Sequence, residues 1–234
     1  MIDTHSHILP GIDDGSKSFA ESLRILKGLA ERGITDVICT PHYVSESTYI
    51  SPRSKNEELL KTLQQKTKEK GISINLYLGN EIYIDREIAK LLRLKKITPL
   101  SGKGKYLLIE LPMSGEFEQY EDIFLSLKEK GWQPILAHPE RYHSFQKDFS
   151  KVESLHKRGI LLQCNLGSFV GQYGKRAKKL AKQIAKQHLI FCVGTDIHHE
   201  RNYDEYTKAQ KVLRKYYQYA ELDAILVQNA RKIL

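Results

Sequence analysis

Short apolar runs alternate with longer amphipathic stretches along the whole of this 234-residue sequence. The apolar runs have the length of β-strands and predict seven of them, at residues 2–6, 36–41, 73–80, 106–110, 134–138, 160–165 and 190–195. The remaining stretches carry apolar residues at helical spacing and predict helices at residues 18–32, 54–70, 85–93, 118–130, 150–158, 174–187, 203–218 and 221–233. Alternation of strands with helices favours a parallel sheet. We therefore expect a single α/β domain over residues 1–234, built as a closed or nearly closed barrel.

Histidines and carboxylates gather at the carboxyl ends of the predicted strands. In an α/β barrel these ends meet at one face, where functional groups collect. Six of the seven predicted strands deliver such residues there, and the strand that ends at Asn165 does not. The full set is His5, His7, Asp14, His42, Glu81, Glu110, His138, Asp196 and His198.

The N-terminal segment IDTHSHILPGIDDG shows how this set begins. His5 and His7 lie two positions apart on a strand, so their side chains point to the same face. An H-x-H pair alone is a weak metal signal, because a polar strand end also explains it. The other strand ends supply the missing donors, so we interpret the pair as one corner of a polynuclear site. We expect Asp3 to orient one of these imidazoles and Asp13 to be a turn residue.

The chemistry of the nine donors predicts a reaction class. Five imidazoles and four carboxylates exceed the needs of one ion, and with shared carboxylates they could hold two or three divalent cations. A mixture of nitrogen and oxygen ligands suits manganese, iron or zinc. Three such ions would outweigh the four carboxylates and attract a phosphate dianion. Closely spaced cations also stabilise both oxygens of an in-line displacement, so the set predicts phosphoester hydrolysis.

Two arginines are candidates for holding the phosphate. Arg141 follows His138 by three residues in HPERY, and Arg201 stands just after DIHHE. A guanidinium group can bind phosphate oxygens through two parallel hydrogen bonds. The alternative for each arginine is a surface salt bridge.

The formal net charge is +9, and much of the excess lies in GKRAKKLAKQIAKQ, residues 174–187. The lysines of this segment fall on the face opposite its apolar residues, which is either a solvated surface or one that attracts an acidic partner or an anionic membrane. No basic segment with interleaved aromatic residues points to a nucleic acid partner. The apolar runs are too short to insert into a bilayer, and a strand that starts at residue 2 leaves no room for a signal peptide. We therefore expect a cytoplasmic protein.

The three cysteines, Cys39, Cys164 and Cys192, all stand in apolar runs, which predicts buried thiols. Cysteine phosphatases of the C-x5-R type need an arginine six positions after the nucleophile. Here those positions hold Ser45, Val170 and His198, which argues against such an enzyme.

The motifs together resemble the PHP (polymerase and histidinol phosphatase) superfamily and, within it, the bacterial tyrosine-protein phosphatases of capsular and exopolysaccharide operons. The matching stretches run from residue 2 to residue 234: IDTHSHILPGIDDG, TPH, GNEIY, IELP, ILAHPERY, LQCNLGS, VGTDIHH and NARKIL. The resemblance implies a distorted seven-stranded (β/α)7 barrel with a trinuclear site, and its metal ligands fall on the nine residues above. Its phosphate-binding arginine falls on Arg141. A second arginine matches Arg201 less closely, because HHERNYDE departs from the commoner loop.

The resemblance also implies a substrate and a partner. Relatives of this kind dephosphorylate tyrosines in the C-terminal tail of a membrane-anchored tyrosine autokinase that governs polysaccharide polymerisation. The alternatives are a small-molecule phosphomonoesterase such as histidinol phosphatase, a regulatory module with a vestigial site, and a nuclease that acts on single-stranded ends. Oligomer formation is possible for any of them.

Overall fold

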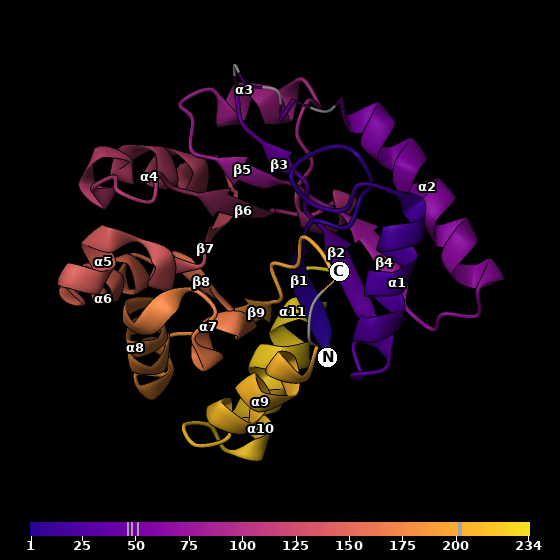
Figure 1. Ribbon diagram of the computed structural model, residues 1–234. Helices are drawn as coiled ribbons and strands as arrows, with labels where there is room; N and C mark the ends of the chain where they lie inside the picture. The colour runs from indigo at the N-terminus through magenta and orange to yellow at the C-terminus, as the bar shows by residue number, and fades with distance from the viewer. Residues whose placement is uncertain (46, 48, 51, 201–202) are drawn as a thin grey trace.

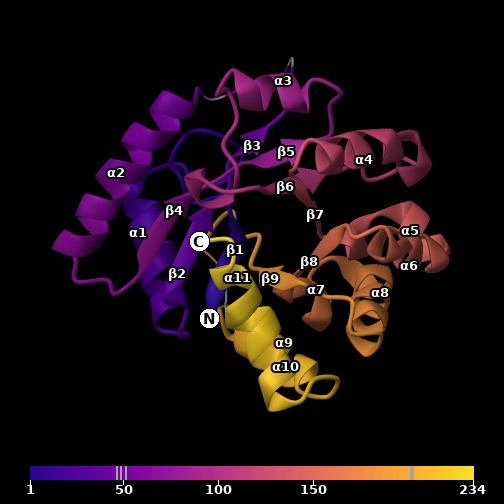
Figure 2. The same ribbon diagram turned by 180° about the vertical axis from the view of Figure 1, so that it is seen from behind.

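The computed structural model describes residues 1–45, 47, 49–50, 52–200 and 203–234. Its strands, all paired in parallel, form a ring in the centre of the molecule, and the helices surround that ring (Figure 1, Figure 2). The strands are β1 (Ile2–Ser6), β2 (Asp36–Cys39), β3 (His42–Tyr43), β4 (Asn75–Leu78), β5 (Glu81–Tyr83), β6 (Tyr106–Glu110), β7 (Gln133–Ala137), β8 (Leu161–Asn165) and β9 (Cys192–Gly194).

Hydrogen bonding divides the ring into two sheets, ordered β1-β2-β4 and β3-β5-β6-β7-β8-β9. The sheets join because β3 continues the direction of β2 after two residues, and β5 continues β4 in the same way. The ring closes between β9 and β1, where Ser6 forms a parallel bridge with Ile197 and the His7 amide donates to the Ile197 carbonyl at 2.9 Å. The prediction of a distorted seven-stranded barrel is thereby confirmed.

Two strands of the ring are interrupted at the same level, between β2 and β3 and between β4 and β5, and the predictions of strands at 36–41 and 73–80 did not extend beyond these breaks. Pro41 has no amide hydrogen to contribute to a ladder, and the side chain of Asn80 bonds the backbone at this point. Its Nδ2 donates to the Pro41 carbonyl at 3.0 Å, and its Oδ1 accepts from the Thr98 amide at 2.8 Å. This break directs the strand ends beyond it, with His42 and Glu81, toward the middle of the ring.

The helices follow the predicted order. The longer ones are α1 (Phe19–Ala30), α2 (Arg53–Glu69), α3 (Ile88–Arg93), α4 (Glu121–Glu129), α6 (Ser150–Lys157), α8 (Gly174–Lys186) and α9 (Asp204–Leu213). The final predicted helix is α10 (Tyr219–Asp223), a π-helical turn η4 (Ala224–Gln228) and α11 (Asn229–Arg231) in direct succession. Periodicity did not predict four short helices: α5 (His143–Lys147), α7 (Leu166–Val170), η1 (Leu100–Gly102) and η3 (Pro139–Arg141). A further short helix, η2 (Phe117–Gln119), precedes α4. Throughout the described ranges, each helix is too short or too polar to span a bilayer.

The strands bury two layers of apolar side chains because successive residues face opposite sides. On β6, Leu107 and Ile109 pack outward against the helices, whereas Leu108 packs into the ring with Ile38 and Ile135. Ile233, after the last helix, belongs to the same inner cluster. The interior at the opposite, carboxyl end of the strands holds the polar side chains predicted from the sequence.

Candidate metal centre

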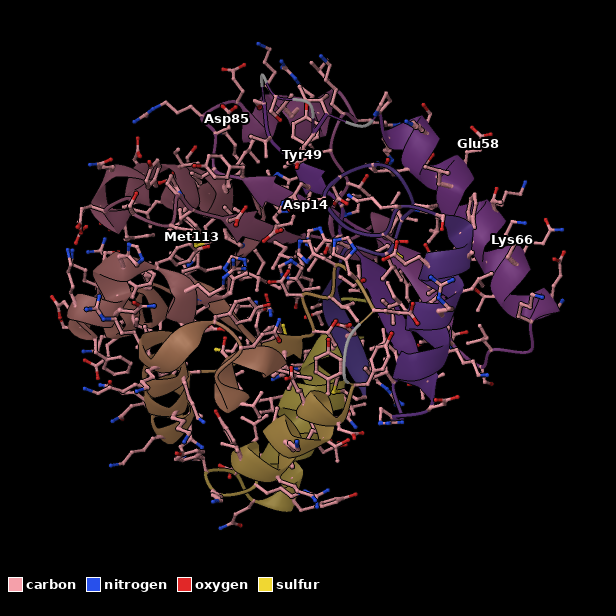
Figure 3. The ribbon with its side chains drawn as sticks, viewed as in Figure 1. Asp14, Tyr49, Glu58, Lys66, Asp85 and Met113 are labelled. Atoms are coloured by element: carbon pink, nitrogen blue, oxygen red, sulfur yellow. The ribbon has the colours of Figure 1, made fainter. Side chains whose placement is uncertain are left out.

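The structure brings all nine predicted donors into one connected group at the mouth of the barrel. One of them, Asp14, is labelled near the middle of Figure 3. His5 stands on β1, His42 on β3, Glu81 on β5 and Glu110 at the end of β6. The others stand in segments that directly follow strands: His7 and Asp14 after β1, His138 after β7, and Asp196 and His198 after β9.

The first part of the group is fully buried and contains four donor atoms that face one another. His5 Nε2 and His7 Nε2 lie 3.0 Å apart. Glu81 Oε2 is 3.3 Å from both imidazole nitrogens, and Asp196 Oδ1 is 3.4 Å from His5 Nε2 and 3.5 Å from His7 Nε2. Ligands held about 2.0–2.2 Å from one cation lie roughly 3.0–3.5 Å from each other. His5 Nε2, His7 Nε2 and Glu81 Oε2 therefore have the spacing of a single coordination sphere, and Asp196 Oδ1 lies beside the two imidazole nitrogens.

A second part adjoins the first through both oxygens of Glu81. His138 Nε2 lies 2.9 Å from Glu81 Oε1, and His42 Nδ1 lies 3.0 Å from Glu81 Oε2. Glu110 faces both histidines, with an oxygen 3.8 Å from each ring nitrogen. Glu81 thus contacts donors on both sides, the arrangement required of a carboxylate that bridges two cations.

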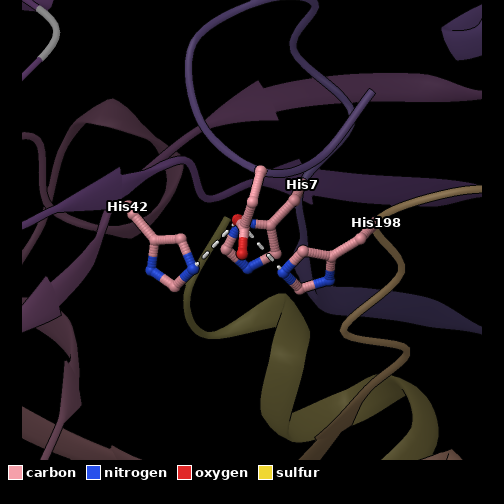
Figure 4. A group of neighbouring side chains, drawn as sticks. His7, His42 and His198 are labelled. Carbon is pink, nitrogen blue, oxygen red and sulfur yellow. Dashed lines mark ion pairs between the residues drawn. The ribbon is translucent and has the colours of Figure 1, made fainter. Parts of the chain in front are cut away.

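The third part lies at the opening of the barrel. Asp14 Oδ1 is 3.4 Å from His42 Nε2 and 3.5 Å from His198 Nε2, and the two ion pairs are dashed in Figure 4. The ring of His7 stacks on that of His198 with centroids 4.1 Å apart. His7 and His42 connect this part to the other two, so the three sets of donors share members.

The charges of these donors show that the group suits cations. Burial opposes ionisation of Glu81 and Asp196, yet the surrounding imidazoles hold both pKa values well below their usual range. Burial and the neighbouring Glu81 carboxylate raise the pKa of Glu110. His138 Nδ1 is buried without a hydrogen-bond partner. A bound cation would relieve the repulsion between the Glu81 and Glu110 carboxylates and the close approach of His5 Nε2 to His7 Nε2, so the residues fit a divalent metal.

Hydrogen bonds from outside the group orient the two histidines of the N-terminal pair. Asp13 Oδ2 lies 2.9 Å from His7 Nδ1, and Gln163 Oε1 lies 3.0 Å from His5 Nδ1. Each contact fixes which ring nitrogen faces the donors. Asp13 is therefore more than the turn residue expected. Asp3 was expected to orient an imidazole, and the structure places its carboxylate elsewhere. It accepts hydrogen bonds from the amide and hydroxyl of Thr195 and, at 3.2 Å, from the backbone amide of His5.

Asp196 is held by three groups through its second oxygen. Oδ2 accepts from Arg141 Nη1 at 2.9 Å, from Asn165 Nδ2 at 2.7 Å and from the Tyr173 hydroxyl at 3.1 Å. The Arg141 guanidinium also lies over the Tyr173 ring, 4.6 Å from its centroid. No metal ligand is predicted from the sequence on the strand that ends at Asn165. Asn165 nevertheless contributes to the site, because it orients the carboxylate of Asp196.

The backbone is strained at two of the residues that supply donor atoms. His138 and Asp196 adopt left-handed conformations, with φ of 34° and 51°. Such conformations cost about 1–3 kcal/mol for residues with a Cβ and persist where the surroundings hold them. Gly194 packs so close to β1 that a Cβ added to it would lie 2.5 Å from the Cβ of His5.

Other sequence predictions have mixed outcomes. Arg141 lies at the centre as expected, whereas Arg201 falls outside the described residues. Cys39, Cys164 and Cys192 are buried free thiols, as predicted. A further aromatic contact comes from Tyr49, in the loop after β3 and labelled in Figure 3, whose ring stacks on that of His42 with centroids 5.7 Å apart.

Comparisons with known proteins agree with this geometry. The sequence profile of the family described as "Capsular polysaccharide synthesis, CpsB/CapC" matches residues 1–234. The putative tyrosine-protein phosphatase CapC of Staphylococcus aureus is 32% identical over 238 residues, which cover 100% of this chain and 91% of that protein. The tyrosine-protein phosphatase YwqE of Bacillus subtilis is 31% identical over 235 residues, with the same coverage of 100% and 91%.

Solved structures show the same fold. One from work on YwqE of Bacillus subtilis and CpsB of Streptococcus pneumoniae, described as unique metal-dependent tyrosine phosphatases, superposes with a TM-score of 0.88 at 29% identity, covering 100% of this chain and 94% of that one. Histidinol phosphate phosphatase of Lactococcus lactis, solved with zinc, L-histidinol and phosphate, superposes with a TM-score of 0.60 at 14% identity, covering 92% and 93%. The second likeness concerns the fold alone.

Proposed function

This chain belongs to the CpsB/CapC family of capsular polysaccharide synthesis, and from that premise we propose that it is a metal-dependent phosphatase that hydrolyses phosphotyrosine in proteins. The observation that carries the proposal is the convergence of nitrogen and oxygen donors in the barrel mouth. Seven of the nine form three sets that share members, and His138 and Asp196 adjoin them. The full-length match to tyrosine-protein phosphatases supports the choice of substrate.

The nine residues would hold two to three divalent ions of manganese, iron or zinc. His5, His7 and Glu81 would surround one ion, His42, Glu81 and Glu110 a second, and His7, Asp14, His42 and His198 a third. Asp196 adjoins the first set and His138 the second. When bound, such ions supply Lewis-acid stabilisation of phosphoryl oxygens and lower the pKa of a bound water.

Arg141 would bind the phosphate group of the substrate. Its Nη1 donates to Asp196 and its plane lies over Tyr173, so the guanidinium is already oriented before a substrate arrives. The remaining N–H groups of the fork are available to hold two phosphate oxygens. A preorganised positive charge of this kind stabilises the charge that develops in the transition state.

The leaving group makes little demand on the protein. A phenolate leaves comparatively easily at neutral pH, so a strong general acid is not needed. The cysteines are not nucleophiles in this proposal, because burial raises their pKa values and all three lie among apolar residues. Hydrolysis would therefore proceed without a covalent phosphoenzyme.

The partner that we propose is the phosphotyrosine-bearing C-terminal tail of a membrane-anchored bacterial tyrosine kinase, in the cytoplasm. Membership of a capsular polysaccharide synthesis family supports this assignment, because the resemblance of the sequence implies a kinase of that kind as the partner. The proposal requires neither nucleic acid nor insertion into a membrane.

The decisive experiment compares two substrates on one preparation. With manganese supplied, we expect hydrolysis of a phosphotyrosine peptide and little or none of histidinol phosphate. The variant His138→Gln should be nearly inactive, and the matched variant His156→Gln, at an exposed histidine of α6, should retain full activity. Turnover of histidinol phosphate alone would replace this assignment with the small-molecule one.

A further inference from the structure

Helix α8 carries an unusual concentration of positive charge. Between Gly174 and Lys186 it holds six basic residues and no aspartate or glutamate: Lys175, Arg176, Lys178, Lys179, Lys182 and Lys186. Within the described part of the chain, no carboxylate forms an ion pair with any of them. Most of the +9 net charge of the protein is thus displayed by one helix of the outer ring (Figure 1).

The charges of α8 are unfavourable for the helix itself. Lys175 and Lys179 are four residues apart, as are Lys178 and Lys182, and like charges at this spacing destabilise a helix. Lys175 and Arg176 stand at the N-terminal end, where the helix dipole disfavours cations, and no side chain caps that end. A segment that breaks several local rules together is expected where function requires it.

The basic helix begins beside the candidate metal centre. Tyr173, the residue before Gly174, donates its hydroxyl to Asp196 and lies under the guanidinium of Arg141. The helix also packs against η3, which contains Arg141. Lys175 and Arg176 are exposed and follow Tyr173 by two and three residues. A chain that places a phosphate at Arg141 therefore passes close to these cations.

From this juxtaposition we propose that α8 is a docking surface for acidic residues that flank the phosphotyrosine of the protein substrate. This inference rests on the proposed phosphatase function and specifies which sequences it prefers. Lys175 to Lys186 spans roughly 16 Å at 1.5 Å per residue, which matches about five residues of an extended peptide. The carboxylates of the substrate would compensate the charge that the helix itself leaves uncompensated.

An anionic membrane is a poorer occupant for this surface. Helices that bind in the membrane interface insert an apolar face between lipids. The apolar residues of α8, including Leu180, Ala181 and Ile184, are buried in the protein core, so only charge is available to lipid. An acidic peptide needs only that charge.

Two phosphotyrosine peptides test the proposal, one with two glutamates on each side of the phosphotyrosine and the other with glutamines in their place. For the wild-type protein with manganese, we expect kcat/KM to be about tenfold higher for the acidic peptide, a preference that falls as salt is added. In the variant Lys175→Gln/Arg176→Gln/Lys179→Gln the ratio should approach one. In the matched variant Lys61→Gln/Lys68→Gln/Lys70→Gln, which removes the same charge from exposed positions between the middle of α2 and the residue after it, the ratio should stay about tenfold.

Binding supplies a second readout that does not depend on turnover. The affinity of the same peptides with a non-hydrolysable phosphonate, measured by fluorescence anisotropy, should change in parallel with kcat/KM. Equal hydrolysis of the two peptides by the wild-type protein would overturn this inference and leave the phosphatase assignment intact. Failure to hydrolyse either peptide would overturn both.

Vesicles test the other occupant. In sedimentation with vesicles that contain phosphatidylglycerol, we expect the wild-type protein and the α8 variant to bind equally weakly. Strong binding that the α8 variant alone loses, together with an unchanged peptide ratio, would identify α8 as a membrane-docking helix and overturn the peptide proposal.

Discussion

The floor and the mouth of the metal centre differ in how their side chains are held. We define the floor as the buried donors His5, His7, Glu81, His138 and Asp196, whose side chains are 0–2% exposed. We define the mouth as the partly exposed residues Asp14, His42, Glu110, Arg141 and His198, which reach 51% exposure at Asp14.

Hydrogen bonds from residues outside the donor group account for much of this difference in how the side chains are held. In the floor, Asp13 orients His7, Gln163 orients His5, and three donors hold Asp196. In the mouth, Asp14 contacts His42 and His198, which are themselves partly exposed. The comparison teaches that the floor donors are held by buried hydrogen bonds from outside the group, whereas the mouth donors Asp14, His42 and His198 are open to solvent, where a substrate would reach them.

The most severe way to break the floor is Glu81→Gln. This side chain contacts His5, His7, His42 and His138, so its loss removes one carboxylate from two sets of donors. We expect kcat/KM to fall by about 10³-fold or more, with a loss of bound metal measured by elemental analysis. The matched variant Glu58→Gln, on the exposed face of α2, should behave like the wild type. Retention of a tenth of the activity by Glu81→Gln would show that the floor is not the reacting centre.

Replacement of Arg141 by lysine tests the mouth with the positive charge retained. Lysine cannot supply the planar fork that binds two oxygens, so kcat/KM for a phosphotyrosine peptide should fall about 10²-fold. Metal content should not change, because Arg141 is not a donor to a cation. Steady-state kinetics and inhibition by inorganic phosphate measure the effect, and a silent substitution would remove Arg141 from the phosphate site.

The smallest of the three effects is expected from Asp13→Asn, which weakens the support of the floor without removing a donor. Asparagine keeps an oxygen for the Gly15 amide, now 2.9 Å from Asp13 Oδ1, but lacks the charge that faces His7. The manganese concentration for half-maximal activity should rise about 10–100-fold, and excess manganese should restore turnover. A fall in activity that manganese cannot restore would assign Asp13 a direct part in the reaction.

Periodicity and strand-end chemistry predicted the barrel and the nine donors because both follow from repeating patterns. The supports of the donors were harder to predict. Asp13 and Asp14 are adjacent in one turn, and only the path of the chain decides which of them faces His7. Gln163 gave a usable signal, since it is a polar residue in an apolar strand on the same face as Asn165. Tyr173 gave none, because it reaches Asp196 through a connection between two helices.

The prediction of helices and strand ends was wrong where the neighbouring residues gave no signal. The segment LGSFV, which forms α7, contains two residues of high strand propensity and a glycine, so tertiary contacts with α8 and α9 decide its conformation. The strand breaks at Pro41 and Asn80 depend on a side-chain bond between them. Such pairings join distant positions, and no window of neighbouring residues reveals them.

The burial of Cys39, Cys164 and Cys192 has a consequence for how the protein meets oxidants. Peroxide attacks exposed thiolates, and phosphatases that depend on one are inactivated when it is oxidised. Here each thiol is shielded by the core, burial raises the pKa of each one, and none belongs to the metal centre. An oxidant that inactivates a thiol-dependent phosphatase therefore finds no exposed thiolate to attack on this protein.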